Sequence, residues 1–230
     1  TDNMKYSWNR IKTINAMVED TSVRYTYYFD IFKYHSNWKT MVLPKQLACF
    51  RYELLDDQKG YVMTEEVGPC EAVDTSGITE KAAMPKEQEE HLYQLLDYLK
   101  KEKLQSLFIL SPTVMEEEKQ MMYNYMTDII ESYGYDFLNM NDYYEEIGLD
   151  FSTDFSDYGG HTNALGAEKC TAFLADYIVN NYSLTDKRGD ERYAKWDAAY
   201  EQWKKEYENA KVVIADKIAN GDFAEITAEE

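Results

Sequence analysis

Two short apolar runs, each preceded by an amphipathic helical pattern, constrain the fold of this chain more than any other feature. Leucines recur at helical spacing through Glu87–Lys103, and a second helical pattern covers Glu116–Tyr133. Each pattern leads into a run of strand length, Ser106–Leu110 and Tyr135–Met140. Helices and strands that alternate with tight connections are typical of α/β units on a parallel sheet. A further helix over Asn163–Tyr182 would lie on that sheet.

The first third of the chain has weaker patterns. Apolar residues at helical spacing predict helices over Met4–Glu19 and Tyr25–Trp38. The stretch Met41–Met84 is irregular and is punctuated by glycine and proline. We expect only short strands in it, around Leu47–Leu54 and Tyr61–Glu65.

The C-terminal segment carries a seam of large side chains at alternating spacings of three and four residues. Such a seam predicts one long amphipathic helix that packs along its own domain or docks on another chain, and we favour packing. We therefore expect an α/β domain over residues 1–185 and a helical extension over residues 186–230. The seam consists of Tyr193, Trp196, Tyr200, Trp203, Tyr207, Ala210 and Ile214.

The composition argues against several classes of partner. The chain has 24 basic and 43 acidic residues and a formal net charge of −19, so we expect neither nucleic acid nor an anionic membrane as a partner. No run approaches the ~20 apolar residues of a membrane span. Its 3 cysteines cannot all pair and show no Cys-x-x-Cys spacing, so neither a disulfide framework nor a zinc site is indicated. We expect no cofactor. The 21 tyrosines suit interfaces and sugar surfaces.

The segment Asp150–Asn163 is the part of the chain whose residues indicate chemistry. His161 immediately precedes a predicted helix, near the carboxyl edge of the predicted sheet, where α/β folds place their sites. The positive end of that helix disfavours imidazolium, which leaves the ring able to accept a proton. Either Asp157 or Asp154 could orient the ring, and two glycines before His161 let the backbone fold back.

Other residues of this segment have simpler or competing roles. Thr162 or Asn163 would cap the helix, and we expect Asn163 and Tyr158 to contact a substrate. A surface histidine without catalytic function is the plain alternative for His161. A metal site is a weaker one, because carboxylates suit Ca²⁺ or Mn²⁺ but the spacing fits no established loop. Its ligands would be Asp150, Asp154, Asp157 and His161.

Residues 154–169, Asp-Phe-Ser-Asp-Tyr-Gly-Gly-His-Thr-Asn-Ala-Leu-Gly-Ala-Glu-Lys, resemble the C-terminal block of SGNH/GDSL-type hydrolases related to bacterial cell-envelope acyl-transfer proteins. Weaker similarity covers Tyr34–Trp38, Lys59–Tyr61 and Asn181–Arg188. The resemblance implies a three-layer, flavodoxin-like parallel-sheet domain. It also implies an esterase or O-acyltransferase of the cell envelope that acts on cell-surface glycan, with His161 as general base.

The chain departs from that family in two ways. The family pattern is Asp-x-x-His, whereas Tyr158 stands three residues before His161 and Asp157 stands four before it. No Gly-Asp-Ser or Gly-x-Ser-x-Gly nucleophile motif occurs, and Ser76 and Ser111 are the nearest imitations.

The missing motif leads to an expectation about the whole domain. We expect it to be incomplete at its N-terminus, with the nucleophilic serine upstream of Thr1. A sheet without its first strands has an unpaired edge, so we expect the N-terminal helices or self-association, through that edge or the Tyr193–Tyr207 helix, to cover it. The alternative function is a non-catalytic module that binds glycan or protein through tyrosine- and tryptophan-rich surfaces.

Overall fold

The computed structural model describes residue 4, residues 6–29, residue 32 and residues 61–225. The chain divides into two compact units, Thr1–Asp56 and Asp57–Glu230. The predictions for Leu47–Leu54, Tyr34–Trp38 and most of Lys59–Tyr61 fall outside the described residues. The expected boundary at residue 185 and the expected cover of a sheet edge stay predictions.

The described part of the first unit contains two helices, α1 (Trp8–Met17) and α2 (Arg24–Tyr28). Helix α1 begins four residues after the predicted start at Met4. Helix α2 begins one residue before the predicted Tyr25 but ends at Tyr28, because Phe29 is extended, so the helix predicted to run through Phe29 is interrupted there. A buried arginine joins them, because the Arg10 guanidinium donates to the carbonyl oxygens of Met4 at 3.0 Å and Tyr27 at 2.9 Å. These two bonds offset part of the cost of burying the charge.

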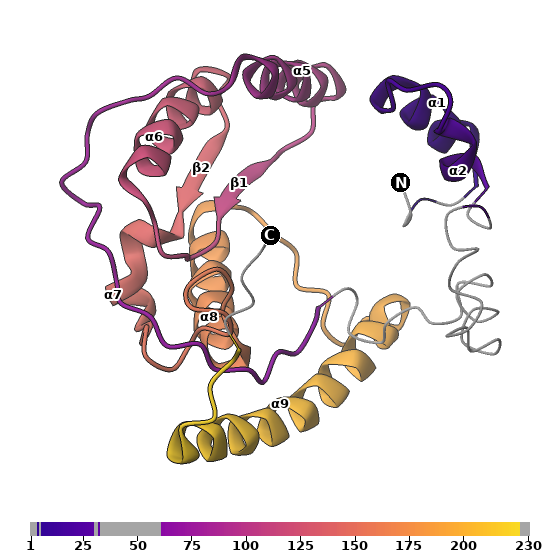
Figure 1. Ribbon diagram of the computed structural model, residues 1–230. Helices are drawn as coiled ribbons and strands as arrows, with labels where there is room; N and C mark the ends of the chain where they lie inside the picture. Colours follow the sequence, from indigo (N-terminus) through magenta and orange to yellow (C-terminus); the bar gives the residue numbers. More distant parts are fainter. Residues whose placement is uncertain (1–3, 5, 30–31, 33–60, 226–230) are drawn as a thin grey trace. The chain divides into compact units, whose positions relative to one another are not determined.

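The second unit is built on two parallel strands, β1 (Leu107–Leu110) and β2 (Asp136–Asn139), joined through helix α6 (Glu117–Ser132) (Figure 1). Two parallel strands need a crossover connection of this kind. The bounds of both strands and of α6 lie within one or two residues of those predicted from the sequence. Within the described residues the sheet has these two strands. The predicted α/β class is confirmed at this level.

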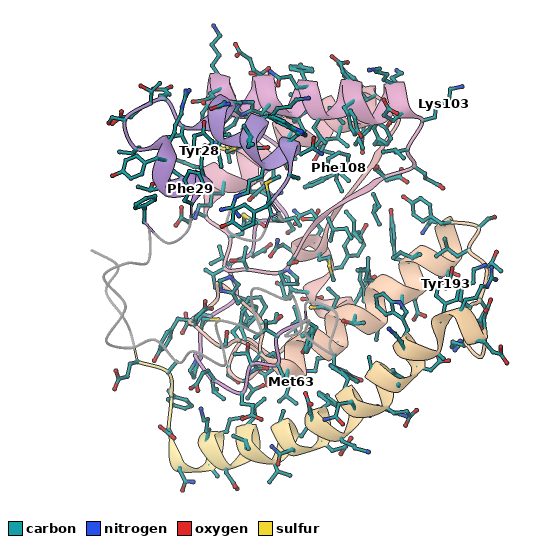
Figure 2. All side chains as sticks on the ribbon, turned by 90° about the vertical axis from the view of Figure 1, so that its right-hand side faces the viewer. Tyr28, Phe29, Met63, Lys103, Phe108 and Tyr193 are labelled. Carbon is teal, nitrogen blue, oxygen red and sulfur yellow. The ribbon has the colours of Figure 1, made fainter. Side chains whose placement is uncertain are left out.

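Helices pack on both faces of the strand pair. On one face, Leu96 of α5 (Lys86–Glu102) and Ile130 of α6 are fully buried, and Phe108 of β1, which is labelled in Figure 2, packs against them. Each such burial contributes about 1.5–3 kcal/mol. On the other face, α8 (Ala164–Asn181) packs against Leu138. It does so through Cys170, Phe173, Leu174 and Tyr177, four of the five residues predicted for this stripe.

Short elements connect the sheet to α8. Strand β2 leads directly into the 3₁₀ turn η2 (Met140–Tyr143) and the single-turn helix α7 (Tyr144–Ile147), neither of which the sequence pattern indicated. Gly148 ends α7 in the left-handed conformation, at φ 72°. The turn η3 (Glu191–Tyr193) later precedes the last helix.

The predicted C-terminal helix exists as α9 (Ala194–Asn220). Ala210 and Ile214 are fully buried against Val67, so the second half of the seam packs on its own unit, as favoured from the sequence. The first half behaves differently, because the side chains of Trp196 and Tyr200 are 58% and 57% exposed.

The predicted strand over Tyr61–Glu65 is wrong. These residues make no strand ladder, and Thr64 instead accepts one backbone hydrogen bond, from Ala164, at 2.9 Å. The short apolar run Tyr61–Met63 here packs along a loop rather than along a sheet. Among the helices of the described ranges, none is long and apolar enough to cross a bilayer.

Candidate functional site

Residues 154–163, here called the His161 loop, fold back on themselves as a short hairpin. Phe155 and Thr162 form an isolated antiparallel bridge. The amide of Asn163 donates to the carbonyl of Asp154 at 2.8 Å, and that of Ser156 to the carbonyl of His161 at 2.9 Å. Residues 157–160 are thus left as the tip of the hairpin.

The tip brings Asp157 and His161 together. Tyr158 and Gly159 have φ angles of 62° and 108°, so the chain turns sharply between the two side chains. Asp157 Oδ1 accepts the backbone N–H of His161 at 2.6 Å, and Oδ2 lies 2.5 Å from the ring nitrogen Nδ1. The turn thus brings Asp157 into contact with a histidine four residues later in the chain.

The Asp157 carboxylate is held in its charged form. Partial burial acts to raise its pKa, but hydrogen bonds from the His161 ring and from the backbone amides of His161 and Gly160 outweigh burial. The pKa of Asp157 therefore lies below its usual value of 3.8. An anion facing Nδ1 favours the tautomer that carries its proton there, which leaves Nε2 as the acceptor nitrogen.

The His161 ring is open to solvent. Its side chain is 83% exposed, and that of Asp157 is 45% exposed. Within the described residues Nε2 makes no hydrogen bond. The pair is therefore oriented and accessible, and the described part of the chain does not shield it from water.

Asp154, the rival orienter, has a different role. Its side chain is 1% exposed and accepts the Lys169 ammonium at 2.6 Å, the Asp150 amide at 2.8 Å and the Thr153 hydroxyl at 3.2 Å. Asp154 thus ties the base of the His161 loop to helix α8. Sequence reasoning missed Lys169, because a lysine inside a helix gives no signal of a partner 15 residues earlier.

Two other segments hold the His161 loop. The amide of Gly68 donates to Phe155 at 2.8 Å, and the carbonyl of Gly68 accepts from Tyr158 at 3.2 Å. On the other side, Gly159 accepts the Val114 amide at 2.8 Å and the Thr113 hydroxyl at 2.7 Å. The tip is therefore positioned from both sides rather than left as a free surface loop.

The two residues expected to contact substrate serve the loop itself. Asn163 is 1% exposed and caps α8, since its Oδ1 accepts the amides of Leu165 and Gly166, and its amide donates to the Thr153 carbonyl at 2.7 Å. The predicted cap is confirmed. Tyr158 is 37% exposed, and its hydroxyl donates to the Ala224 carbonyl at 2.6 Å.

An open cleft of 430 Å³, here called the His161 cleft, lies beside the ring. Ser111 enters it directly after β1, with an exposed side chain that makes no hydrogen bond within the described residues. Ser156 is 7% exposed, and its hydroxyl donates to the His161 carbonyl. The lining is Tyr61, Val62, Thr64, Ser111, Pro112, Ser156, Gly160, His161, Thr162 and Ala167.

The metal hypothesis is not supported by the geometry. Asp150 accepts the hydroxyl and amide of Ser152, while Asp154 is directed to Lys169, so the acidic side chains do not converge on His161. No group of three or more metal-ligating side chains occurs in the described part of the chain.

A thiol near the loop is not an alternative nucleophile. Burial, and secondly the charge of Asp157, raise the pKa of Cys70 to about 11, so this thiol is protonated at neutral pH.

Comparison of the chain with protein-family models, with curated protein sequences and with solved structures gave no match to any of them.

Proposed function

We propose that the Asp157–His161 pair is the acid/base half of an SGNH-type esterase or O-acyltransferase that acts on an ester of cell-surface glycan. The observation that carries the proposal is the 2.5 Å contact of Asp157 Oδ2 with Nδ1 of a ring whose other nitrogen is unpartnered in the described chain and adjoins an open cleft. The resemblance of residues 154–169 to that family supports the same interpretation. The envelope location that the resemblance implies is part of the proposal.

The chemistry follows from the orientation of the ring. Nε2 takes a proton from a hydroxyl as the hydroxyl attacks an ester carbonyl, and Asp157 stabilises the imidazolium that forms. His161 then returns the proton to the leaving alcohol. Since the ring is 83% exposed, a bound substrate has to cover it and exclude water before the electrostatic pairing gains full strength.

The hydroxyl to be activated is a separate part of the proposal. Ser111 is the exposed serine of the His161 cleft, but α6 begins six residues later, at Glu117, so Ser111 does not lie on a strand-to-helix elbow. Ser76 lies outside the cleft and donates its hydroxyl to Asp74 at 2.6 Å. We propose a serine outside these residues as nucleophile, and the Ser111→Ala variant tests the alternative.

The test is hydrolysis of 4-nitrophenyl acetate by the full chain, with water as the nucleophile that His161 activates in the place of the proposed serine hydroxyl. We expect His161→Ala to lower kcat/KM by at least ~10-fold, since general base catalysis contributes about 10²–10⁴-fold. Asp157→Asn should lower it by a smaller factor, because the ring stays but loses its orienting anion. Ser111→Ala should leave the rate unchanged.

His91→Ala is the matched control, because His91 is an exposed histidine of α5 that does not line the His161 cleft. Its rate should equal that of the unmodified chain. Equal rates for His161→Ala and His91→Ala would refute the proposal. If Ser111→Ala lowered kcat/KM as much as His161→Ala does, the proposed reaction would stand, but Ser111 would be identified as its nucleophile.

The alternative function, a glycan- or protein-binding module, is favoured by one observation. Trp196 and Tyr200 expose more than half of their surface on the first half of α9. Large exposed aromatic side chains are enriched where proteins bind partners. A combined Trp196→Ala and Trp203→Ala variant would abolish such binding, while His161→Ala would not affect it.

A further inference from the structure

A broad groove, separate from the His161 cleft, lies at the carboxyl end of β2, the edge where parallel α/β folds bind ligands. It has two adjoining lobes of 460 and 480 Å³, and either volume suits a small-molecule pocket. No residue that lines a lobe also lines the His161 cleft. We call it the amide groove. Both lobes are lined by Ile78, Gln120, Asn124, Asp142 and Tyr143.

The floor of the amide groove is a network of buried amides. Gln120, Asn139 and Asn141 are 4%, 6% and 7% exposed. Asn139 donates to Gln120 at 3.4 Å and to Asp142 at 3.1 Å, and accepts from Asn141 at 2.9 Å. Gln120 in turn donates to Asn124 at 2.9 Å. Buried amides are costly unless bonded, and mutual bonding fixes their orientation before a ligand arrives.

This network keeps unused hydrogen-bonding capacity toward the groove. Within the described residues Gln120 Nε2 donates once, so one N–H remains, and Asp142 Oδ2 accepts no bond. The hydroxyls of Tyr143 and Tyr177 also have no hydrogen-bond partner there. Partial burial, against the opposing bond from Asn139, raises the pKa of Asp142, while its side chain remains exposed and open to a ligand in the groove. The groove thus presents fixed donors and acceptors to a ligand.

Aromatic rings supply the apolar part of the amide groove. Tyr123 stacks on Phe137 with centroids 6.4 Å apart, and Tyr143 packs on Phe173 at 5.3 Å. These contacts hold the rings in place at low entropic cost to a ligand. A ligand that suits this surface has apolar C–H faces as well as several hydroxyls.

The charges of the amide groove disfavour an anion. Lys81 is the basic residue of its lining, and its ammonium is paired with Asp128 at 2.5 Å. Asp74, Glu131 and the two glutamates of α7 lie exposed at the rim, where water and salt screen them. The polar groups of the floor are amides and phenols, which recognise neutral hydroxyls.

We propose that the amide groove binds a neutral oligosaccharide that extends across both lobes. The amides and Asp142 bond its hydroxyls, and the tyrosine rings contact its C–H faces. Because the groove shares no lining residue with the His161 cleft, the inference does not rest on the proposed enzymatic function.

The experiment is isothermal titration calorimetry of the full chain with cellohexaose, xylohexaose and the hexamer of N-acetylglucosamine. At least one should bind with a Kd of about 1 mM or tighter. Asp142→Asn removes the charged acceptor and Tyr177→Phe removes one hydroxyl, and each variant should weaken binding by about 10-fold. Both changes preserve side-chain shape, and thermal unfolding of the variants verifies their folding.

Asp97→Asn and Tyr133→Phe are the matched controls, because that pair hydrogen-bonds at 3.0 Å outside the groove. They and His161→Ala should leave the Kd unchanged. The inference is overturned if none of the three hexamers binds, or if binding survives Asp142→Asn and Tyr177→Phe. Ten-fold tighter binding of the cationic glucosamine hexamer or the anionic galacturonate hexamer would equally overturn the neutral class.

Discussion

Replacing Lys169 by methionine should destabilise the second unit, because it leaves a buried carboxylate without its counter-charge. Asp154 is 1% exposed, and Lys169 is 34% exposed. Breaking a buried ion pair by removing one partner costs about 3–5 kcal/mol. Here the Asp150 amide and Thr153 hydroxyl still solvate Asp154, so we expect a loss of about 2–3 kcal/mol. Methionine keeps the packing of the lysine stem.

Urea unfolding followed by far-UV circular dichroism measures this loss of stability. In thermal unfolding, the Tm should fall by roughly 4–12 °C. Lys119→Met is the matched control with the same change of charge, because Lys119 pairs with Glu116 at 3.5 Å where both side chains are more than half exposed. It should cost less than about 0.5 kcal/mol. Adding Asp154→Asn to Lys169→Met should recover part of the loss. Equal stability of the Lys169→Met and Lys119→Met variants would refute the inference that the Asp154–Lys169 ion pair stabilises the second unit.

Three further outcomes follow from the same loop and its surroundings. Gly68→Ala should cost about 2 kcal/mol or more in urea unfolding, since its Cβ would lie 2.4 Å from a backbone nitrogen of the loop tip, whereas Gly77→Ala, with nothing within 4 Å, should be tolerated. Burial raises the pKa of Cys70 and of Cys170 to about 11, so mass spectrometry should show alkylation at pH 8 slower by on the order of 100-fold than for a peptide thiol. The folded pKa of Asp157 lies below its unfolded value, so the stability that this carboxylate contributes is present above about pH 4 and is lost as the pH falls through the folded pKa. In the Asp157→Asn variant, the free energy of unfolding should therefore fall less steeply at acidic pH than in the unmodified chain.

The sequence predicted the regular elements of the second unit closely because their physics is local. The helical spacing of leucines predicted α5, and the two short apolar runs predicted β1 and β2 to within about two residues. Capping is equally local, which is why Asn163 could be named as an N-cap candidate. The strand predicted over Tyr61–Glu65 was wrong because a short run of β-favouring residues does not show whether a neighbouring strand is available to pair with it.

The candidate site could be predicted only in part, because its decisive contacts join distant residues. From the sequence Asp154 remained a rival of Asp157, and the ion pair with Lys169 distinguishes the two by holding Asp154 inside the protein. Support of the tip by Gly68 comes from far upstream in the chain and leaves no periodic signal. The amide groove was missed for the same reason, since its side chains come from separate elements and a loop.

The different roles of the two aspartates connect stability to the proposed chemistry. Asp154 serves the structure: its side chain anchors α8 through Lys169, and its carbonyl accepts the amide of the helix cap. Asp157, three residues later, does not contact α8 in this way, and its half-exposed carboxylate faces the His161 ring. Loss of the Asp154–Lys169 ion pair should therefore disorder the Asp157–His161 pair, although neither of those two residues is changed. A Lys169→Met variant that remains folded should lose ester hydrolysis nearly as far as Asp157→Asn does, whereas full activity in it would show that the tip is positioned by its contacts with Gly68 and Val114 alone.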